Sequence, residues 1–164
     1  MELYYTNSFK NRNDSHKLLE KVLGSIGGLT KSEAGKPFIP GGRYFSISHS
    51  EGSWAVLVAD EECGLDIQFE RTADELKIAK RWYHPDESAV VAEDEDAFFR
   101  IWTRREAMVK AAGTGIIDSG LPSTLADEVE YEGVTWQLKD ISIPGIDHAA
   151  VCAKTIDEIK IIEL

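Results

Sequence analysis

The sequence predicts an α+β protein, because some segments place apolar residues at the spacing of a helix and others at the spacing of a strand. Residues 96–113 (DAFFRIWTRREAMVKAAG) have helical spacing and end at a glycine, as many helices do. Residues 65–69 (LDIQF) alternate apolar and polar side chains, which is typical of a half-buried strand. Helices and strands are therefore expected to be interspersed along one chain of 164 residues.

The segment before residue 65 is expected to contain one helix and one hairpin. Residues 15–26 place leucine, valine and isoleucine side chains on one side of a helix, which Gly27 and Gly28 are expected to end. Residues 45–48 and 54–59 are short, largely apolar and joined by HSEGS, which predicts the two strands of a hairpin.

The segment after residue 69 is expected to contain helices followed by strands. Pro85 separates two short helices, at 73–83 and 86–92, and the long 96–113 helix comes next. Pro144 and Gly145 form a turn in the tail. The tail strands are expected at 128–131, 134–142 and 148–154.

Composition limits the classes of function. A net charge of −11 argues against nucleic acid as a partner. No stretch of about 20 apolar residues occurs, so no membrane span is expected. Cys63 and Cys152 are far apart in sequence, which favours neither a disulfide framework nor a zinc site. The first residues lack the basic-then-apolar pattern of a signal peptide, and we expect a cytoplasmic protein without a membrane partner.

Trp102, Glu106 and Lys110 recur every four residues and share one face of the 96–113 helix with Gly113. Glu106 and Lys110 alone would be an ordinary surface ion pair, worth a few tenths of a kcal/mol. The tryptophan on the same face and the glycine-rich GTGI that follows favour a functional site. From the helix alone, both interpretations stand.

Four motifs occur in order over residues 35–116: GKPF at 35–38, FSISHS at 45–50, GLDIQ at 64–68 and WTRREAMVKAAGTGI at 102–116. Together they resemble the 4′-phosphopantetheinyl transferases, whose pattern is roughly G-K-P, F-x-x-S-H-S, G-x-D-x-E and W-T-x-K-E-x-x-x-K-x-x-G. The nearer branch is the larger type, which activates nonribosomal peptide and polyketide synthases. Four motifs in the right order are far more specific than any one of them.

The resemblance implies a reaction, its substrates and a fold. The 4′-phosphopantetheine arm of coenzyme A would pass to a serine of an apo acyl or peptidyl carrier protein, with release of adenosine 3′,5′-bisphosphate. Mg²⁺, or Mn²⁺ in its place, would assist. The fold would consist of two similar α/β halves related by a pseudo-twofold axis, here residues 1–60 and 61–164, with coenzyme A between them.

The resemblance also implies roles for individual residues. Asp66, Gln68 and Glu106 match the metal-binding positions, and Lys110 matches a lysine that contacts phosphate. Mg²⁺ prefers oxygen ligands and needs only one or two protein carboxylates, which suits this set. Glu106 and Lys110 would be catalytic, together with Glu87, an acid within RWYHPDE that would help to deprotonate the incoming serine.

Coenzyme A would be held largely by residues of the first half. Ser48 and His49 match a pair that hydrogen-bonds its phosphates. Lys36, with Pro37 fixing the backbone beside it, matches the G-K-P contact near the nucleotide. Lys110 would bind the substrate as well.

The sequence departs from the family pattern in three places. Gln68 stands where the pattern has glutamate; its amide oxygen can bind Mg²⁺ but adds no charge, so metal affinity should fall. Arg105 replaces the usual lysine before the catalytic glutamate and keeps the charge. Few residues precede GKPF, whereas the larger branch has extra basic residues there that bind the 3′-phosphate. Lys17, next to His16, takes that role by position.

Docking of a carrier protein would need a local basic patch, because carriers are usually acidic and this chain is acidic overall. Lys77, Lys80 and Arg81 are expected to supply part of that patch, with Trp82 and Tyr83 as apolar anchors.

Two other functions remain open. A shortened relative with Gln68 could bind coenzyme A or a carrier without transferring the arm. RREAMVKAAGTG is also superficially similar to the R-E-x-x-E-E-x-G box of Nudix pyrophosphate hydrolases, although Val109 and Lys110 occupy the stretch of the paired glutamates. A serine–histidine hydrolase is disfavoured, because FSISHS lacks the glycines of a nucleophile elbow and no acid is evidently placed to orient His49.

Overall fold

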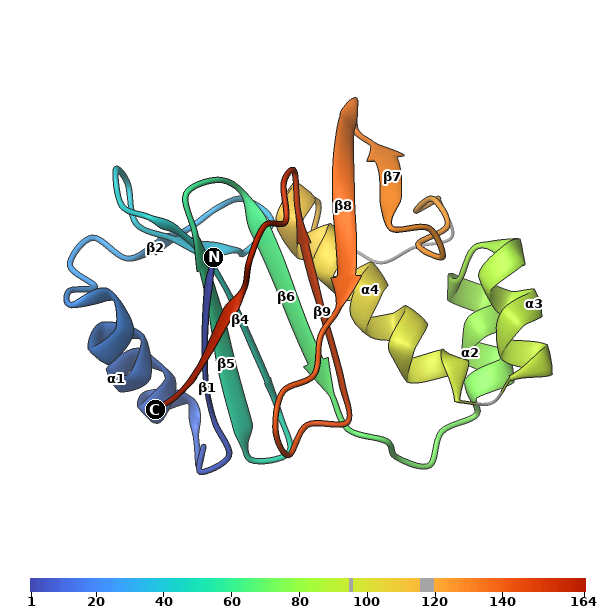
Figure 1. Ribbon diagram of the computed structural model, residues 1–164, viewed down its shortest axis with the longest axis horizontal. Coiled ribbons are helices and arrows are strands. Elements are labelled where there is room, and N and C mark those ends of the chain that lie inside the picture. The colour runs from blue at the N-terminus through green and yellow to red at the C-terminus, as the bar shows by residue number, and fades with distance from the viewer. Residues whose placement is uncertain (95, 116–119) are drawn as a thin grey trace.

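The computed structural model describes residues 1–94, 96–115 and 120–164 and confirms a mixed α+β architecture (Figure 1). Two four-stranded sheets occupy the centre, with one helix at one end of the molecule and three toward the other. Among the described residues, no helix has the length and apolar character needed to cross a membrane. The helices are α1 (Arg12–Leu23), α2 (Glu75–Trp82), α3 (Pro85–Glu93) and α4 (Ala97–Ala112).

The first sheet combines strands from both ends of the sequence. In spatial order, its strands are β10 (Lys160–Glu163), β1 (Glu2–Thr6), β5 (Ser53–Ala59) and β4 (Tyr44–Ser50). Neighbouring strands are antiparallel, except that β10 runs parallel to β1. Helix α1 packs on one face of this sheet, where Leu19 joins an apolar cluster with Trp54 and Val56.

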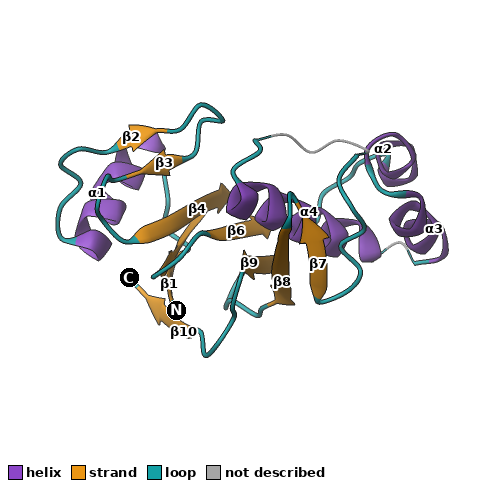
Figure 2. Cartoon of the chain, turned by 90° about the horizontal axis from the view of Figure 1, so that it is seen from above, coloured by secondary structure: helices purple, strands orange, loops and turns teal. Residues whose placement is uncertain are grey.

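The second sheet is antiparallel throughout and is covered by α4, as the view from above shows (Figure 2). In spatial order, its strands are β6 (Cys63–Gln68), β9 (His148–Ala153), β8 (Val134–Asp140) and β7 (Glu128–Tyr131). Helices α2 and α3 pack against each other beyond one end of α4. A short two-stranded ribbon, β2 (Thr30–Lys31) with β3 (Pro37–Phe38), precedes β4.

The two sheets meet where β4 lies alongside β6. The hydroxyl of Ser46 accepts a hydrogen bond from the Leu65 amide at 3.0 Å, and the hydroxyl of Ser48 accepts one from the Ile67 amide at 3.2 Å. These contacts advance together along both strands, so β4 and β6 run in the same direction. Serine oxygens therefore bridge the two sheets at a line where no backbone ladder joins them.

Gly64 allows α4 to lie directly on β6. A Cβ atom at this position would be 1.8 Å from the carbonyl oxygen of Ala107 and 2.7 Å from the amide nitrogen of Ala111. Real Cβ atoms do not approach backbone so closely, so any side chain would push the helix away from the strand. The glycine of the GLDIQ motif thus sets the spacing between Asp66, two residues later on β6, and α4.

Most predicted elements are present with shifted ends. The long helix ends at Gly113 as expected, in a left-handed conformation with φ 71°. The first helix lies three residues earlier than expected, because it begins at Arg12 and its C-cap is Gly24, with φ 78°, before Gly27 is reached. The ribbon of β2 and β3 and the pairing of β1 with β10 were not predicted, since short strands acquire their pattern only from distant partners.

Candidate active site

Asp66 and Lys110 form an ion pair between β6 and α4. Asp66 is 3% exposed, and alternation along β6 turns it toward α4 while Leu65 and Ile67 enter the core on the other face. Lys110 Nζ lies 2.7 Å from Asp66 Oδ1 and also donates to the carbonyl oxygen of Leu65 at 3.0 Å. Asp66 Oδ1 also accepts a hydrogen bond from the Ser48 hydroxyl at 2.8 Å. The carboxylate is therefore held from two elements at once.

Glu106 lies one helical turn before Lys110 and is half-buried. Burial and the nearby Asp66 carboxylate raise the pKa of Glu106, and the Lys110 ammonium opposes this shift without cancelling it. Two carboxylates thus share a partly desolvated region with one ammonium. This excess of negative charge is what a divalent cation would neutralise.

Gln68 completes the oxygen-bearing face of β6. Its Nε2 donates to Asp66 Oδ2 at 3.2 Å, and a half-turn of the amide would present Oε1 in the same place. Among the described residues, no group of three or more histidine, cysteine, aspartate and glutamate side chains could hold a metal ion. Two carboxylates and an amide still fit Mg²⁺, because this ion keeps several waters and takes further oxygens from substrate phosphates.

A cavity of about 220 Å³ opens beside Glu106 and Lys110. The G-K-P segment lines it through Lys36 and Pro37, and β4 contributes Ser46, so three of the predicted motifs meet at one place. Gly113 and Gly115 also line the cavity. Between them, the buried hydroxyl of Thr114 has no hydrogen-bond partner among the residues that the structure describes. Such a donor is normally satisfied, so it suits contact with a bound ligand.

A family model described as the 4′-phosphopantetheinyl transferase superfamily matches residues 62–140, which include β6 and α4. The 4′-phosphopantetheinyl transferase AcpT of Salmonella typhi is 35% identical over 123 residues. These matches show that the chain is similar to the 4′-phosphopantetheinyl transferase superfamily. The Sfp enzyme of Bacillus subtilis is 32% identical over 129 residues, and gsp of Aneurinibacillus migulanus is 36% identical over 93 residues, both being named 4′-phosphopantetheinyl transferases.

These alignments are partial in both directions. They cover 66% of this chain for AcpT and for Sfp and 52% for gsp. They cover 64% of AcpT, 57% of Sfp and 38% of gsp, so the match spans less than two thirds of each relative.

Lys36 and Pro37, which were expected to contact coenzyme A near its nucleotide, line the cavity. The Lys36 ammonium, however, already has partners within the protein. Lys36 Nζ donates to Glu62 Oε2 at 2.5 Å and to the carbonyl oxygen of Cys63 at 3.1 Å. These bonds fasten the G-K-P segment to the turn that leads into β6. Pro37 and Lys36 also line a second cavity of about 340 Å³, which includes the exposed aromatic ring of Tyr44.

Ser48 and His49, expected to act together on coenzyme A in this superfamily, point to opposite faces of β4. Ser48 is 5% exposed and faces Asp66. His49 is exposed, and its ring lies 5.3 Å from that of Phe9. The exposed Lys17 belongs to α1, on the His49 side of the sheet, and the structure does not bring it to the Asp66 cluster.

Glu87 lies apart from the cluster and is completely buried, which differs from the expected contact with an incoming serine. Its Oε2 lies 2.5 Å from Nη1 of Arg105 and 3.0 Å from the backbone nitrogen of His84. Its Oε1 accepts hydrogen bonds from the amide and the hydroxyl of Thr124, both at 2.7 Å. A carboxylate enclosed in this way cannot reach a substrate hydroxyl in this structure.

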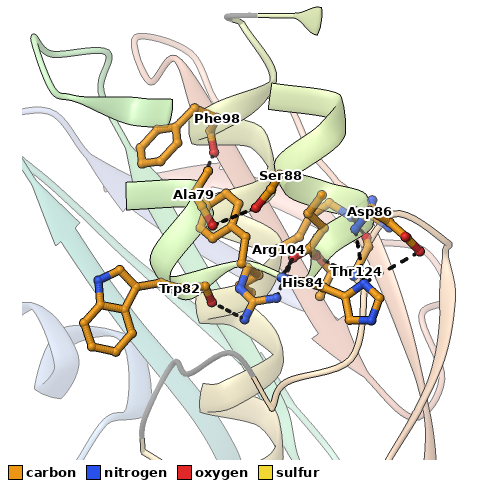
Figure 3. Close-up of polar contacts among 11 residues, drawn as sticks. Ala79, Trp82, His84, Asp86, Ser88, Phe98, Arg104 and Thr124 are labelled. Atoms are coloured by element: carbon orange, nitrogen blue, oxygen red, sulfur yellow. Dashed lines mark hydrogen bonds and ion pairs between the residues drawn. The ribbon is translucent and has the colours of Figure 1, made fainter. Parts of the chain in front are cut away.

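The surroundings of this buried pair join three segments of the chain. Figure 3 shows Trp82, His84 and Thr124, which come from α2, the turn before α3 and the loop before β7. Arg105 Nη2 donates to the carbonyl oxygen of Trp82 at 2.9 Å, and Arg104 Nε donates to that of Thr124 at 2.6 Å. Polar contacts therefore fasten α2, α3 and this loop to α4.

An apolar cavity that the sequence did not predict lies one turn before Glu106 on α4. It measures about 340 Å³ and is lined by Ile78 and Trp82 of α2 and by Phe98 and Trp102 of α4, among others. The one available signal was Trp102, which shares a helical face with Glu106. The other lining residues belong to segments whose packing against α4 could not be predicted from local sequence.

Proposed function

We propose that this chain transfers the 4′-phosphopantetheine arm of coenzyme A to a serine of an apo acyl or peptidyl carrier protein, releasing adenosine 3′,5′-bisphosphate. The observation that carries the proposal is the meeting of Asp66, Glu106 and Lys110 beside the cavity lined by the G-K-P segment. The names of the superfamily relatives support the same reaction.

Asp66 and Glu106 would hold Mg²⁺ or Mn²⁺, with Gln68 contributing its amide oxygen. When bound, the metal would neutralise negative charge on the pyrophosphate of coenzyme A as the phosphoanhydride breaks. Lys110 would contact the same pyrophosphate, because its ammonium is fixed at the cavity wall by Asp66. The apolar cavity beside Trp102 suits the gem-dimethyl part of the arm.

The serine hydroxyl must lose a proton as its oxygen bonds to the β-phosphorus. We assign acceptance of that proton to Glu106, since Glu87 is enclosed by Arg105 and Thr124. The P–O bond to the adenosine bisphosphate then breaks, and Lys110 stabilises the charge on the departing phosphate.

The carrier protein would dock on α2, which exposes Lys77, Lys80 and Arg81. Trp82 is 39% exposed, and the Arg81 guanidinium lies 4.8 Å from its ring centroid, so both are presented at the surface. Tyr83 is 3% exposed, with its hydroxyl donating to the carbonyl oxygen of Phe98, and it does not serve as an anchor.

The proposal includes an arrangement of the chain as two similar halves. Residues 1–60 and 61–164 would be the two halves, with a pseudo-twofold axis passing between β4 and β6. In support, each sheet has four strands and a helix on the face away from the shared core. β10 is an exception, since it joins the first sheet.

Cys63 and Cys152 are free thiols, which suits the reducing environment of the cytoplasm, the compartment that we propose for this protein.

The test is intact-mass spectrometry of apo peptidyl, polyketide and fatty-acyl carrier proteins incubated with the protein, coenzyme A and Mg²⁺. A gain of one phosphopantetheine, lost in Glu106→Ala and on addition of a chelator, would establish the transfer and its metal requirement. No gain on any carrier, together with measurable coenzyme A binding, would identify a non-catalytic relative. Cleavage of free coenzyme A or ADP-ribose without a carrier would identify a pyrophosphate hydrolase.

A further inference from the structure

We infer that Phe9 is a positioning residue, which orients the ring of His49 toward the 3′-phosphate of coenzyme A. The inference rests on the proposed function, in which His49 contacts a phosphate of that substrate. It gives a role to the loop between β1 and α1, which lies outside the four sequence motifs.

Phe9 and His49 form an aromatic pair near the surface. Their ring centroids lie 5.3 Å apart, with 31° between the ring planes, and aromatic rings attract each other at this separation. His49 is exposed, and within the described part of the chain neither of its ring nitrogens has a hydrogen-bond partner. Phe9 therefore restrains the ring of His49 while both nitrogen atoms stay available for a ligand.

The loop that carries Phe9 is fastened to the β4–β5 hairpin that carries His49. The backbone nitrogen of Phe9 donates to the carbonyl oxygen of Gly52 in the hairpin turn at 2.8 Å. Asn7 Oδ1 accepts a hydrogen bond from the Ser53 hydroxyl, also at 2.8 Å. Because these bonds fix the backbone on both sides of residue 8, the ring of Phe9 is held against His49.

The two faces of β4 separate the phosphates of coenzyme A. Ser48 faces Asp66, where the pyrophosphate would bind, and His49 points to the opposite face. Helix α1 covers that face, because it packs on Trp54, the register partner of His49. The exposed Lys17 of α1 adds a cation on this side of the sheet. Coenzyme A has one phosphate besides its pyrophosphate, the monoester at the 3′ position of the ribose, and His49 is assigned to it.

The experiment is isothermal titration calorimetry with coenzyme A and with 3′-dephospho-coenzyme A, which differ only in that phosphate. Phe9→Leu keeps an apolar side chain but removes the ring, so binding of coenzyme A should weaken about three- to tenfold. Binding of 3′-dephospho-coenzyme A should not change. Phe9→Tyr keeps the ring, so it should bind both compounds as the wild type does.

A double-mutant cycle with His49→Ala separates positioning from a general loss of packing. If Phe9 acts through His49, Phe9→Leu should cause no further loss of coenzyme A binding in the His49→Ala background. Ile26→Ala is the packing control, because Ile26 is a partly buried member of the same apolar cluster and lies beyond the other end of α1. It should lower the melting temperature without changing the preference for coenzyme A over the 3′-dephospho compound.

Transfer kinetics provide a further readout. Phe9→Leu should raise the KM for coenzyme A about three- to tenfold and leave kcat unchanged. Unchanged affinity of Phe9→Leu for coenzyme A would overturn the inference, as would an equal loss for the two compounds or an undiminished effect in the His49→Ala background. If the wild type transfers no arm and the calorimetric differences persist, the proposed function fails and this inference stands.

Discussion

Arg105 and Glu106 are neighbours on α4, yet they enter opposite electrostatic environments. Arg105 meets Glu87 in a sealed pair in which both side chains are fully buried. Glu106 lies half-exposed near a second carboxylate, Asp66, and burial with that repulsion raises its pKa. The Glu87 pair is balanced in charge and hydrogen-bonded on every carboxylate oxygen, whereas the Asp66–Glu106 region has an excess of negative charge.

The comparison indicates that the Arg105–Glu87 pair stabilises the fold, whereas the Asp66–Glu106 region is suited to bind a cation. A buried ion pair is tolerable only when its polar atoms are satisfied inside the protein, and Glu87 meets that condition. Carboxylates that remain uncompensated cost stability until a cation binds them, and natural proteins keep such costs at functional sites. Four substitutions test this contrast, beginning with the largest expected effect.

Glu87→Gln should break the sealed pair. It leaves the buried Arg105 charge without its counterion, which is expected to lower the free energy of unfolding by about 3–5 kcal/mol. Urea unfolding followed by circular dichroism measures this loss. The isosteric Glu106→Gln, one residue along the helix from Arg105, is the control and should not be destabilised. A normal unfolding free energy with a reduced kcat would instead return the role of proton acceptor to Glu87.

Gly64→Ala should break the contact between β6 and α4 that holds together Asp66, Gln68, Glu106 and Lys110, here called the open cluster. Its new methyl group would meet the Ala107 carbonyl, so α4 must move away from β6, at a cost of about 1–3 kcal/mol. Transfer should fall by more than about tenfold, because Asp66 and Glu106 separate when the helix moves.

The control is Gly27→Ala, where the added Cβ would make only an ordinary contact at 3.6 Å with Ser25 Oγ. That variant should unfold within about 0.5 kcal/mol of the wild type. If both alanine variants behave alike, the close approach of α4 and β6 at Gly64 does not set the geometry of the site.

Gln68→Glu should sharpen the contrast by adding a third negative charge to the open cluster. Mn²⁺ binding without coenzyme A should tighten by about tenfold, because ligand charge governs affinity for hard cations. Isothermal titration calorimetry measures the change, and Gln68→Ala serves as the control that should bind no tighter than the wild type. Unchanged affinity in Gln68→Glu would remove residue 68 from the metal site.

Glu106→Gln should have a small stabilising effect, with a size that depends on pH. The pKa of Glu106 is raised above its usual value of 4.5, so the folded state disfavours the charged form. Wild-type stability without metal should therefore decline as pH rises from about 4 through the raised pKa. Because glutamine cannot ionise, the melting temperature of the variant should exceed that of the wild type by an amount that grows with pH up to the raised pKa of Glu106 and is constant above it.

Thermal melts in chelator between pH 4 and 8 measure that difference. Glu33→Gln, a change at an exposed loop position, is the control and should track the wild type at every pH. A melting-temperature difference between Glu106→Gln and the wild type that does not vary with pH would contradict the assigned cause.

The open cluster could be predicted from local sequence, because its positions follow from two simple periods. Alternation along β6 placed Asp66 and Gln68 on one face, and four-residue spacing placed Glu106 and Lys110 on one side of α4. The close approach of the two elements could be expected only from the family pattern, since its physical cause is the contact of Gly64 with Ala107.

The sealed pair could not be predicted in the same way. Whether Glu87 faces solvent or Arg105 depends on Thr124, 37 residues later in the chain, which binds one of its oxygens. The orientation of Ser48 is a similar case, because alternation along β4 gives two faces but does not say which one meets β6. Contacts between distant segments decided both outcomes.

The parallel pairing of β1 with β10 also affects how the protein is made. Met1 donates through its terminal amine to the carbonyl oxygen of Glu158, and Glu2 is the register partner of Lys160. During synthesis β5 can pair with β1 early, but the other edge of β1 stays open until residues 160–163 leave the ribosome. Exposed strand edges invite pairing with other chains. The nascent chain is therefore exposed to aggregation at this edge until β10 pairs with β1, and slowing the codons for residues 160–163 would prolong that interval.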